Sequence, residues 1–174
     1  MSKSLIKDLA DFVNTVLTEE SSAYRLLQGQ FVPITNESEI EAVDAAMDSG
    51  IGAVRDHLSA ASRFLSNRKA PDYRNSIKES ISAVESLMKV LTKKKSATLS
   101  EGLKRISGVV GLHPALSLGF EKLYAYTSDE EGVRHAIFDE AKVTHADAKY
   151  FLVSCSAFIN YVLEKFSENQ EPIK

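Results

Sequence analysis

Apolar residues recur every three or four positions along most of the chain, which is the spacing of one face of an α-helix. The pattern occupies six stretches: 5–17, 40–65, 73–91, 99–106, 116–124 and 148–166. Little of the remaining sequence alternates as a strand would, so the pattern predicts an all-α protein. We expect a compact bundle of about six helices, because amphipathic helices bury their apolar faces against one another.

Residues that favour helix starts precede three of these stretches. In each case an Asn or Thr is followed three positions later by an acidic residue, as in a capping box. The pairs are Asn36 with Glu39, Thr98 with Glu101, and Thr144 with Asp147. A further cap is expected at His113, immediately before Pro114, where a capping role is favoured over a catalytic one.

Glycine and proline mark the expected breaks between helices. Gly50 and Gly52 interrupt the 40–65 pattern, which predicts either one long helix with a weak point near residue 50 or two helices broken there. Pro71 is expected in the first turn of the next helix, where its missing N–H costs no hydrogen bond. Gly108 is expected to end the helix that Thr98 begins.

The segment "AYRLLQGQFVPI", residues 23–34, departs from helical spacing. Two short apolar runs flank a central glycine, which predicts a small β-hairpin or an irregular loop. Two strands alone are marginally stable, so the hairpin should rest on the helices. We therefore predict one domain over residues 1–167, with an N-terminal helix and hairpin extension over 1–35, and a disordered tail over 168–174.

The 174 residues carry a formal net charge of −3, with 44% hydrophobic and 26% charged residues. These values are ordinary for one globular domain with its own core. A negatively charged chain repels nucleic acid, so any RNA binding must come from a local basic patch. The run Lys93–Lys95 is the one run of positive charge in the sequence, and its pattern favours a solvated loop over a binding site.

Familiar cofactor and metal motifs are missing from the sequence. It has no glycine-rich phosphate loop and its four histidines are scattered, so we expect neither a cofactor nor a metal. Cys155, the single cysteine, lies among apolar neighbours, which indicates a core residue. No apolar run reaches the ~20 residues of a membrane helix, and early charged residues argue against a signal peptide. A cytoplasmic protein without membrane contact is the simplest interpretation.

Two helical faces are candidates for contacts with other molecules. On the 73–91 helix, a helical wheel places Arg74, Lys78 and Glu85 on one edge of the apolar stripe, where they would line any neighbouring groove. The alternative is a solvated border of compensating charges. The 148–166 helix has a second, weaker apolar stripe opposite its main face. A helix that is apolar on two sides is either central in its bundle or faces a partner, which here would be a second copy in a homodimer. The second stripe consists of Tyr150, Val153, Ala157 and Tyr161.

Three longer segments carry a family resemblance: "YRNSIKESISAVESL", "LHPALSLGFEKLYAYTSDEEGVRHAIFDE" and "DAKYFLVSCSAFINYVLEKF". They resemble the helical C-terminal domain of abortive-infection proteins of the AbiJ type, grouped with the HEPN-like superfamily (higher eukaryotes and prokaryotes nucleotide-binding). "AYRLLQGQFVPIT" resembles the piece that precedes this domain, so the similarity covers roughly residues 20–167. It implies a helical bundle that dimerises. In many members it also implies metal-independent endoribonuclease activity in antiphage or toxin–antitoxin systems, whereas others serve as binding or assembly modules.

Active members of the superfamily carry an arginine and a histidine separated by four to six residues. This chain departs from that spacing, since seven residues separate Arg105 from His113 and none separates Arg134 from His135. The adjacent pair Arg134–His135 is the feature that matches the AbiJ-type pattern. Transfer of the catalytic motif by spacing therefore fails.

The residue types at 134 and 135 nevertheless suit RNA cleavage. His135 can serve as base or acid near neutral pH, and Arg134 can clamp a phosphate through its planar fork. Successive helical residues point about 100° apart, and five acids surround the pair in "SDEEGVRHAIFDE". Those acids would repel RNA unless other cations lie close. The alternative is a salt-bridged corner with a structural role.

Two functions of different classes follow. The first is an RNA-targeting effector in phage defence, with Arg134 and His135 as catalytic residues and Arg74, Lys78 and Glu85 as binding residues. The second is a non-catalytic dimerisation or regulatory module, which contacts its partner through the second stripe of the last helix.

Overall fold

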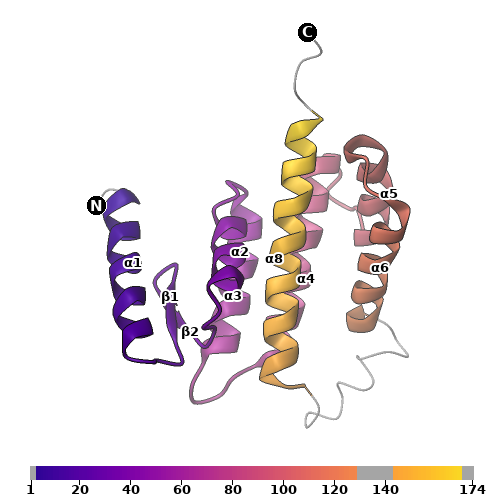
Figure 1. The fold of residues 1–174 in the computed structure, drawn as a ribbon. Coiled ribbons are helices and arrows are strands. Elements are labelled where there is room, and N and C mark those ends of the chain that lie inside the picture. Colours follow the sequence, from indigo (N-terminus) through magenta and orange to yellow (C-terminus); the bar gives the residue numbers. More distant parts are fainter. Residues whose placement is uncertain (1–2, 129–142, 170–174) are drawn as a thin grey trace.

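The computed structural model describes residues 3–128 and 143–169. They form seven helices and one two-stranded antiparallel sheet (Figure 1). The elements are α1 Lys3–Glu19, β1 Arg25–Leu27, β2 Gln30–Val32, α2 Glu37–Met47, α3 Gly52–Ser66, α4 Tyr73–Thr92, α5 Leu99–Val110, α6 Pro114–Ser128 and α8 His145–Glu168. The predicted all-α bundle with a short hairpin is therefore confirmed.

Helix α4 lies at the centre of the arrangement. It packs along α3, contacts α8 on another side, and is flanked by α5 and α6 (Figure 1). Helix α8 in turn packs on α2 and α3. The buried apolar side chains of these helices form one core, in which Leu58, Leu87, Leu103 and Leu152 are fully buried. Residues distant in sequence thus share one apolar interior, as a single domain requires.

The predicted helix starts are confirmed by their hydrogen bonds. The side chain of Asn36 accepts from the backbone N–H of Glu39, and that of Thr98 accepts from the N–H of Glu101. His113 Nδ1 accepts from the N–H of Ala115 at the start of α6, at 3.2 Å. These contacts satisfy amide groups that a helix leaves unpaired in its first turn.

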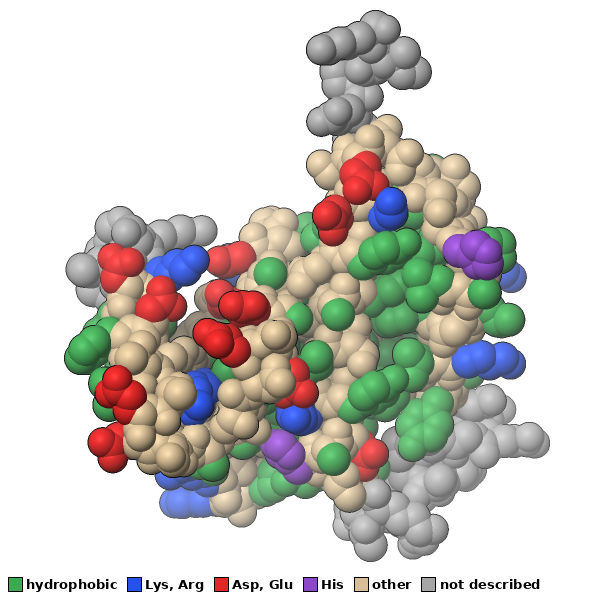
Figure 2. All heavy atoms as spheres, in the orientation of Figure 1, with side chains coloured by type: hydrophobic (Ala, Val, Ile, Leu, Met, Phe, Trp, Pro, Cys, Tyr) green, Lys and Arg blue, Asp and Glu red, His purple; other side chains and the backbone are tan. Residues whose placement is uncertain are grey.

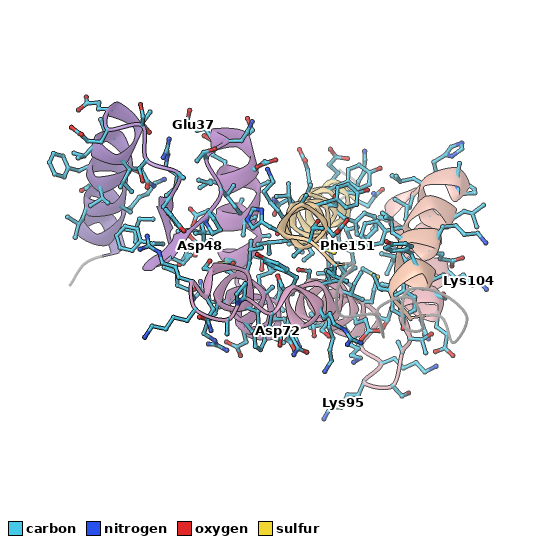
Figure 3. The ribbon with its side chains drawn as sticks, turned by 90° about the horizontal axis from the view of Figure 1, so that it is seen from below. Glu37, Asp48, Asp72, Lys95, Lys104 and Phe151 are labelled. Carbon is cyan, nitrogen blue, oxygen red and sulfur yellow. The ribbon has the colours of Figure 1, made fainter. Side chains whose placement is uncertain are left out.

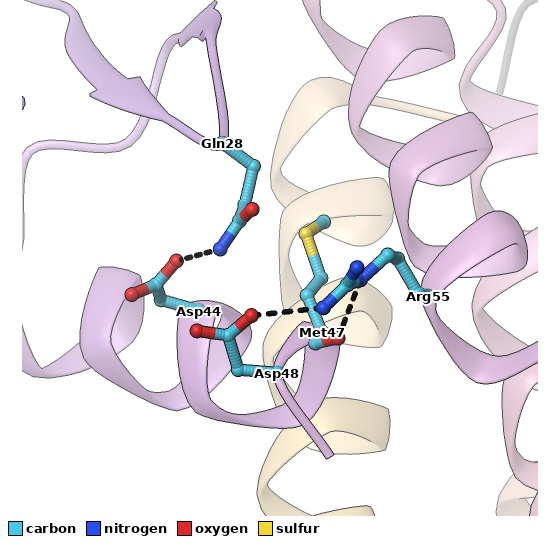
Figure 4. A network of polar contacts seen from close by, with 5 residues as sticks. All are labelled: Gln28, Asp44, Met47, Asp48 and Arg55. Carbon is cyan, nitrogen blue, oxygen red and sulfur yellow. Dashed lines mark hydrogen bonds and ion pairs between the residues drawn. The ribbon is translucent and has the colours of Figure 1, made fainter. Parts of the chain in front are cut away.

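The weak point near residue 50 is a true break. Helix α2 ends at Met47 and α3 begins at Gly52, with Gly50 at φ +79°, a conformation that L side chains rarely adopt. Arg55 holds the corner, because its Nε donates to the carbonyl oxygen of Met47 and its guanidinium pairs with Asp48, both at 3.0 Å (Figure 4). Of the two predicted alternatives, two helices is the correct one.

Two predicted boundaries were wrong by a few residues. Pro71 lies before the cap of α4, not in its first turn, because Asp72 is the capping residue and accepts from the N–H of Asn75 at 3.0 Å. Gly108 does not end α5, which continues to Val110. The helix stops at Gly111, whose φ of +63° provides the left-handed cap that glycine adopts without a steric penalty.

The hairpin pairs Arg25 with Val32 and Leu27 with Gln30, and its buried residues rest on α3. Helix α1 contacts the outer edge of β1. There the Asn14 amide pairs with both backbone groups of Leu26, donating to its oxygen at 2.9 Å and accepting from its N–H at 2.6 Å. Asn14 thus satisfies an exposed strand edge as a neighbouring strand would. In addition, Gln28 donates to Asp44 of α2 at 2.6 Å (Figure 4).

Helix α8 extends to Glu168, and Asn169 is its C-terminal cap. Residues 170–174 of the predicted tail lie outside the described residues. Among the helices that the structure describes, none has both the length and the apolar character needed to cross a membrane.

Replacing Gly102 with alanine is expected to destabilise the protein. A β-carbon there would lie 2.6 Å from Met88 Cβ and 2.9 Å from Met88 Cγ, so α4 and α5 would have to move apart. The expected loss of unfolding free energy is about 1–3 kcal/mol, measured by urea unfolding followed by helical circular dichroism. Gly108→Ala on the same helix is the control. Nothing lies within 4 Å of its added carbon, so it should stabilise by up to ~1 kcal/mol. Equal effects of the two substitutions would contradict the close contact.

Candidate functional site

The proposed binding residues lie on α4. Arg74 and Lys78 are one turn apart near its start, and Glu85 is two turns further along. Lys78 is exposed, whereas Arg74 and Glu85 are half-buried. The three residues therefore share one edge of α4, which is the placement that the helical wheel predicts, while their binding role stays a prediction.

The proposed catalytic residues, Arg134 and His135, lie outside the described residues. The structure does describe where the chain resumes. The ring of His145, the first residue of α8, lies edge-on to Tyr73, the first residue of α4, with 6.1 Å between ring centroids. The segment that carries Arg134 and His135 therefore joins α8 beside the end of α4 that carries Arg74.

A capping box fixes this junction. Thr144 donates to Asp147 Oδ2 through its hydroxyl at 2.6 Å and through its backbone N–H at 2.8 Å. In return the Thr144 hydroxyl accepts from the N–H of Asp147. Both hydrogen bonds from Thr144 lower the pKa of Asp147 below its usual value. The bond from the hydroxyl has the larger effect, and the bond from the backbone N–H has the next largest. The start of α8 is thus tied by reciprocal bonds at the point where the chain enters the bundle.

A histidine–carboxylate pair that the sequence did not suggest links α3 to α4. His57 Nδ1 lies 2.7 Å from Glu79 Oε2, and the two side chains are 35% and 20% exposed. A carboxylate in this position orients an imidazole, as it does in many acid–base sites. The pair also clamps two helices that pack along each other, so a structural role accounts for it fully. No sequence signal pointed to it, since the partners are 22 positions apart in the chain.

Other candidate groups have structural explanations. Cys155 is fully buried, and burial raises the pKa of its thiol, which keeps it protonated and unreactive. Lys94, from the basic run, pairs with Glu101 at 3.1 Å, and Lys93 is the left-handed cap of α4. Within the ranges that the structure describes, no group of three or more His, Cys, Asp and Glu could hold a metal ion.

The second stripe of α8, which the sequence predicts as a contact surface, is apolar and partly exposed to solvent. Tyr150 is 53% exposed and Ala157 is exposed, while Val153 and Tyr161 are half-buried against the core. No charged residue occurs from Tyr150 to Leu163, although one side of this stretch faces solvent. Such a helix face differs from an ordinary surface helix, whose exposed side is charged.

The chain matches no protein-family model, no curated protein and no solved structure. The class that the fold itself defines is an all-α bundle with a small hairpin appended. Two features are candidates for function within it: the α4 edge beside the junction of α8, and the uncharged outer face of α8.

Asp147→Ala should destabilise the protein by about 1 kcal/mol at pH 7, because two hydrogen bonds at the start of α8 are lost. The pKa of Asp147 is lowered in the folded state, so its contribution is present above the usual Asp pKa and is lost as the pH falls through the folded value. The difference in unfolding free energy between the two proteins should therefore shrink below about pH 4. Urea unfolding at several pH values measures it.

The matched control is Asp56→Ala, which removes an exposed aspartate from α3. This change should alter stability by less than about 0.5 kcal/mol. A pH-independent effect of Asp147→Ala would show that the carboxylate of Asp147 does not contribute through its charge.

Proposed function

We propose that this chain is a self-association module: a HEPN-like helical domain of a cytoplasmic antiphage protein that joins other copies of itself through the outer face of α8. The observation that carries the proposal is the stretch from Tyr150 to Leu163, which has no charge and yet is partly exposed. Exposed apolar surfaces of this kind mark sites of protein–protein contact.

The chemistry of this face supports an interface. Tyrosine residues stand at both ends of the stripe, and Ala157 lies between them. Tyrosine is enriched at interfaces because it combines a large apolar ring with a polar hydroxyl. A small residue at the centre allows the backbone of a partner helix to approach closely. The stripe therefore has the composition of a contact surface and lacks the charges of a solvated one.

Ala157→Glu tests this proposal, because Ala157 is exposed and its substitution leaves the core intact. The parent protein should have at least twice the mass of one chain in light scattering at high concentration. The variant should have the mass of a single chain, because association would bury an unpaired charge. Tyr161→Glu should act in the same direction, with some loss of stability since Tyr161 packs against the core.

The control is Ala45→Glu, the same chemical change at an exposed position of α2. This variant should retain the mass of the parent protein. A parent protein that stays a single chain at high concentration would remove the proposal.

RNA cleavage is the second candidate function, with Arg134 and His135 as the reacting pair. One observation favours it: the contact of His145 with Tyr73 places the start of α8, which follows their segment, at the end of α4 that carries Arg74 and Lys78. His135 lies nine positions before Thr144, a span of at most ~30 Å. Cations on α4 would offset the acids of "SDEEGVRHAIFDE" and attract phosphate.

The double substitution Arg134→Ala with His135→Ala separates this candidate from the first. If the pair cleaves RNA, the purified parent protein degrades total RNA in the presence of a chelator, and the double variant loses this activity by at least about a hundredfold. Arg105→Ala with His113→Ala, the loss of one arginine and one histidine elsewhere, should leave cleavage intact. The parent protein and both double variants must have equal helical circular dichroism, so that lost activity does not reflect unfolding. Cleavage by the double variant at the parental rate would exclude the pair from the mechanism.

A further inference from the structure

Helices α6 and α8 are held apart by aromatic side chains. Phe120 of α6 stacks on Phe158 of α8 with 3.7 Å between ring centroids, and Tyr126 lies parallel to Phe151 at 6.0 Å. Figure 2 shows the result as an apolar band, hollowed between the two helices. The seam between α6 and α8 is therefore a groove with an aromatic floor.

The walls of the groove are apolar on both sides. Its α8 wall is the second stripe, which includes Tyr150 and Tyr161, and Tyr150 contacts Phe151 of the floor edge-on. Its α6 wall has apolar residues at Leu116, at Leu123 two turns later and at Tyr126 a further turn on, of which the first and last are 43% and 53% exposed. A straight groove between two helices, apolar on both walls, is suited to an amphipathic helix.

The same chain contains such a helix with an exposed apolar stripe. On α1, Leu9, Phe12 and Val16 follow one another at steps of three and four residues and are 54%, 67% and 41% exposed. The opposite side of α1 rests on the hairpin through Asn14. The stripe of Leu9, Phe12 and Val16 is therefore presented to solvent by a helix that is already fixed in position.

Charge distinguishes the two ends of the molecule. Residues 3–48, which include α1 and α2, contain nine Asp or Glu residues and three Lys or Arg residues. Residues 89–127, which include α5 and most of α6, contain two Asp or Glu residues and seven Lys or Arg residues. Figure 3 shows Glu37 and Asp48 in the α1–α2 half and Lys95 and Lys104 in the α5–α6 half. On a helical wheel, Asp8 and Glu19 border the exposed stripe of α1. Four of those seven cations, Lys89 and Lys93–Lys95, lie at the end of α4 and just after it. The acidic α1–α2 end of one copy and the basic α5–α6 end of another are electrostatically complementary.

We propose that α1 of one copy lies in the α6–α8 groove of a second copy. The proposal rests on the proposed function, because it names the element that covers the outer side of α8. Helix α1 and the groove lie on opposite sides of the bundle (Figure 1). The contact is therefore head-to-tail, and each added copy presents a new α1 and a new groove, which leads to a ring or an open chain rather than to a two-fold dimer.

Crosslinking between single cysteines identifies the occupant. A Phe12→Cys protein is mixed with an Ala157→Cys protein of different tag length and treated with a short bis-maleimide. The native Cys155 is buried and does not react. The expected product is a mixed Phe12→Cys/Ala157→Cys species. The control is Thr18→Cys, on the exposed polar side of α1, which should give no mixed product with Ala157→Cys.

A product that Ala157→Cys forms with itself, without the mixed species, would overturn the inference. It would mean that α8 faces α8, which leaves self-association through this helix in place. Light scattering makes the same distinction. The double variant Leu9→Glu with Phe12→Glu should abolish association, as Ala157→Glu does. If only the Ala157→Glu variant loses association, α1 is not the occupant of the groove. If the parent protein is a single chain, both proposals are refuted.

Discussion

The close approach of α3 and α4 is the contact on which the rest of the bundle depends. Small residues make it possible: Ala61 and Ser62 of α3 meet Ser76 and Ser80 of α4, all of them buried. The hydroxyl of Ser76 crosses the interface to the carbonyl oxygen of Ala61 at 2.9 Å, and that of Ser80 returns to its own helix at 2.8 Å. At positions 76 and 80, serine thus gives the small volume that close packing needs and satisfies its own polar atom. The buried hydroxyl of Ser62 has no hydrogen-bond partner among the described residues. Gly102 brings α5 against the opposite side of α4 by the same means.

This central packing leaves α8 with two environments. Its inner side covers α4 and contributes Phe151, Cys155 and Ile159 to the core, while its outer side has no further helix of the described chain on it. Polar ties fix its orientation, because Lys149 pairs with Glu39 and Asn160 donates to the carbonyl oxygen of Ala42, both on α2. The apolar outer side of α8 is therefore a fixed feature of the fold, which is why a contact surface is the function best supported by its geometry.

The candidate site was only partly accessible from the sequence. Helical periodicity placed Arg74, Lys78 and Glu85 on one edge, and it found the second stripe of α8, because both features lie within single helices. The groove beside α8 was not predictable, since it depends on how far Phe120 and Tyr126 hold α6 from α8. The sequence also did not show that the apolar stripe of Leu9, Phe12 and Val16 on α1 is exposed. An apolar helix face looks the same in sequence whether the fold covers all of it or part of it.

The sequence by itself determined the class of fold, the position of the hairpin and most helix starts. Those depend on local chemistry: the spacing of apolar residues, and side chains such as Asn36 and Thr98 that bond a backbone amide three residues away. Only the tertiary structure decided that Asn14 closes the edge of β1 and that His57 meets Glu79, because these partners are 12 and 22 positions apart in the chain. It likewise decided which apolar faces remain open to solvent, since burial is a property of the whole assembly of helices and not of any one of them.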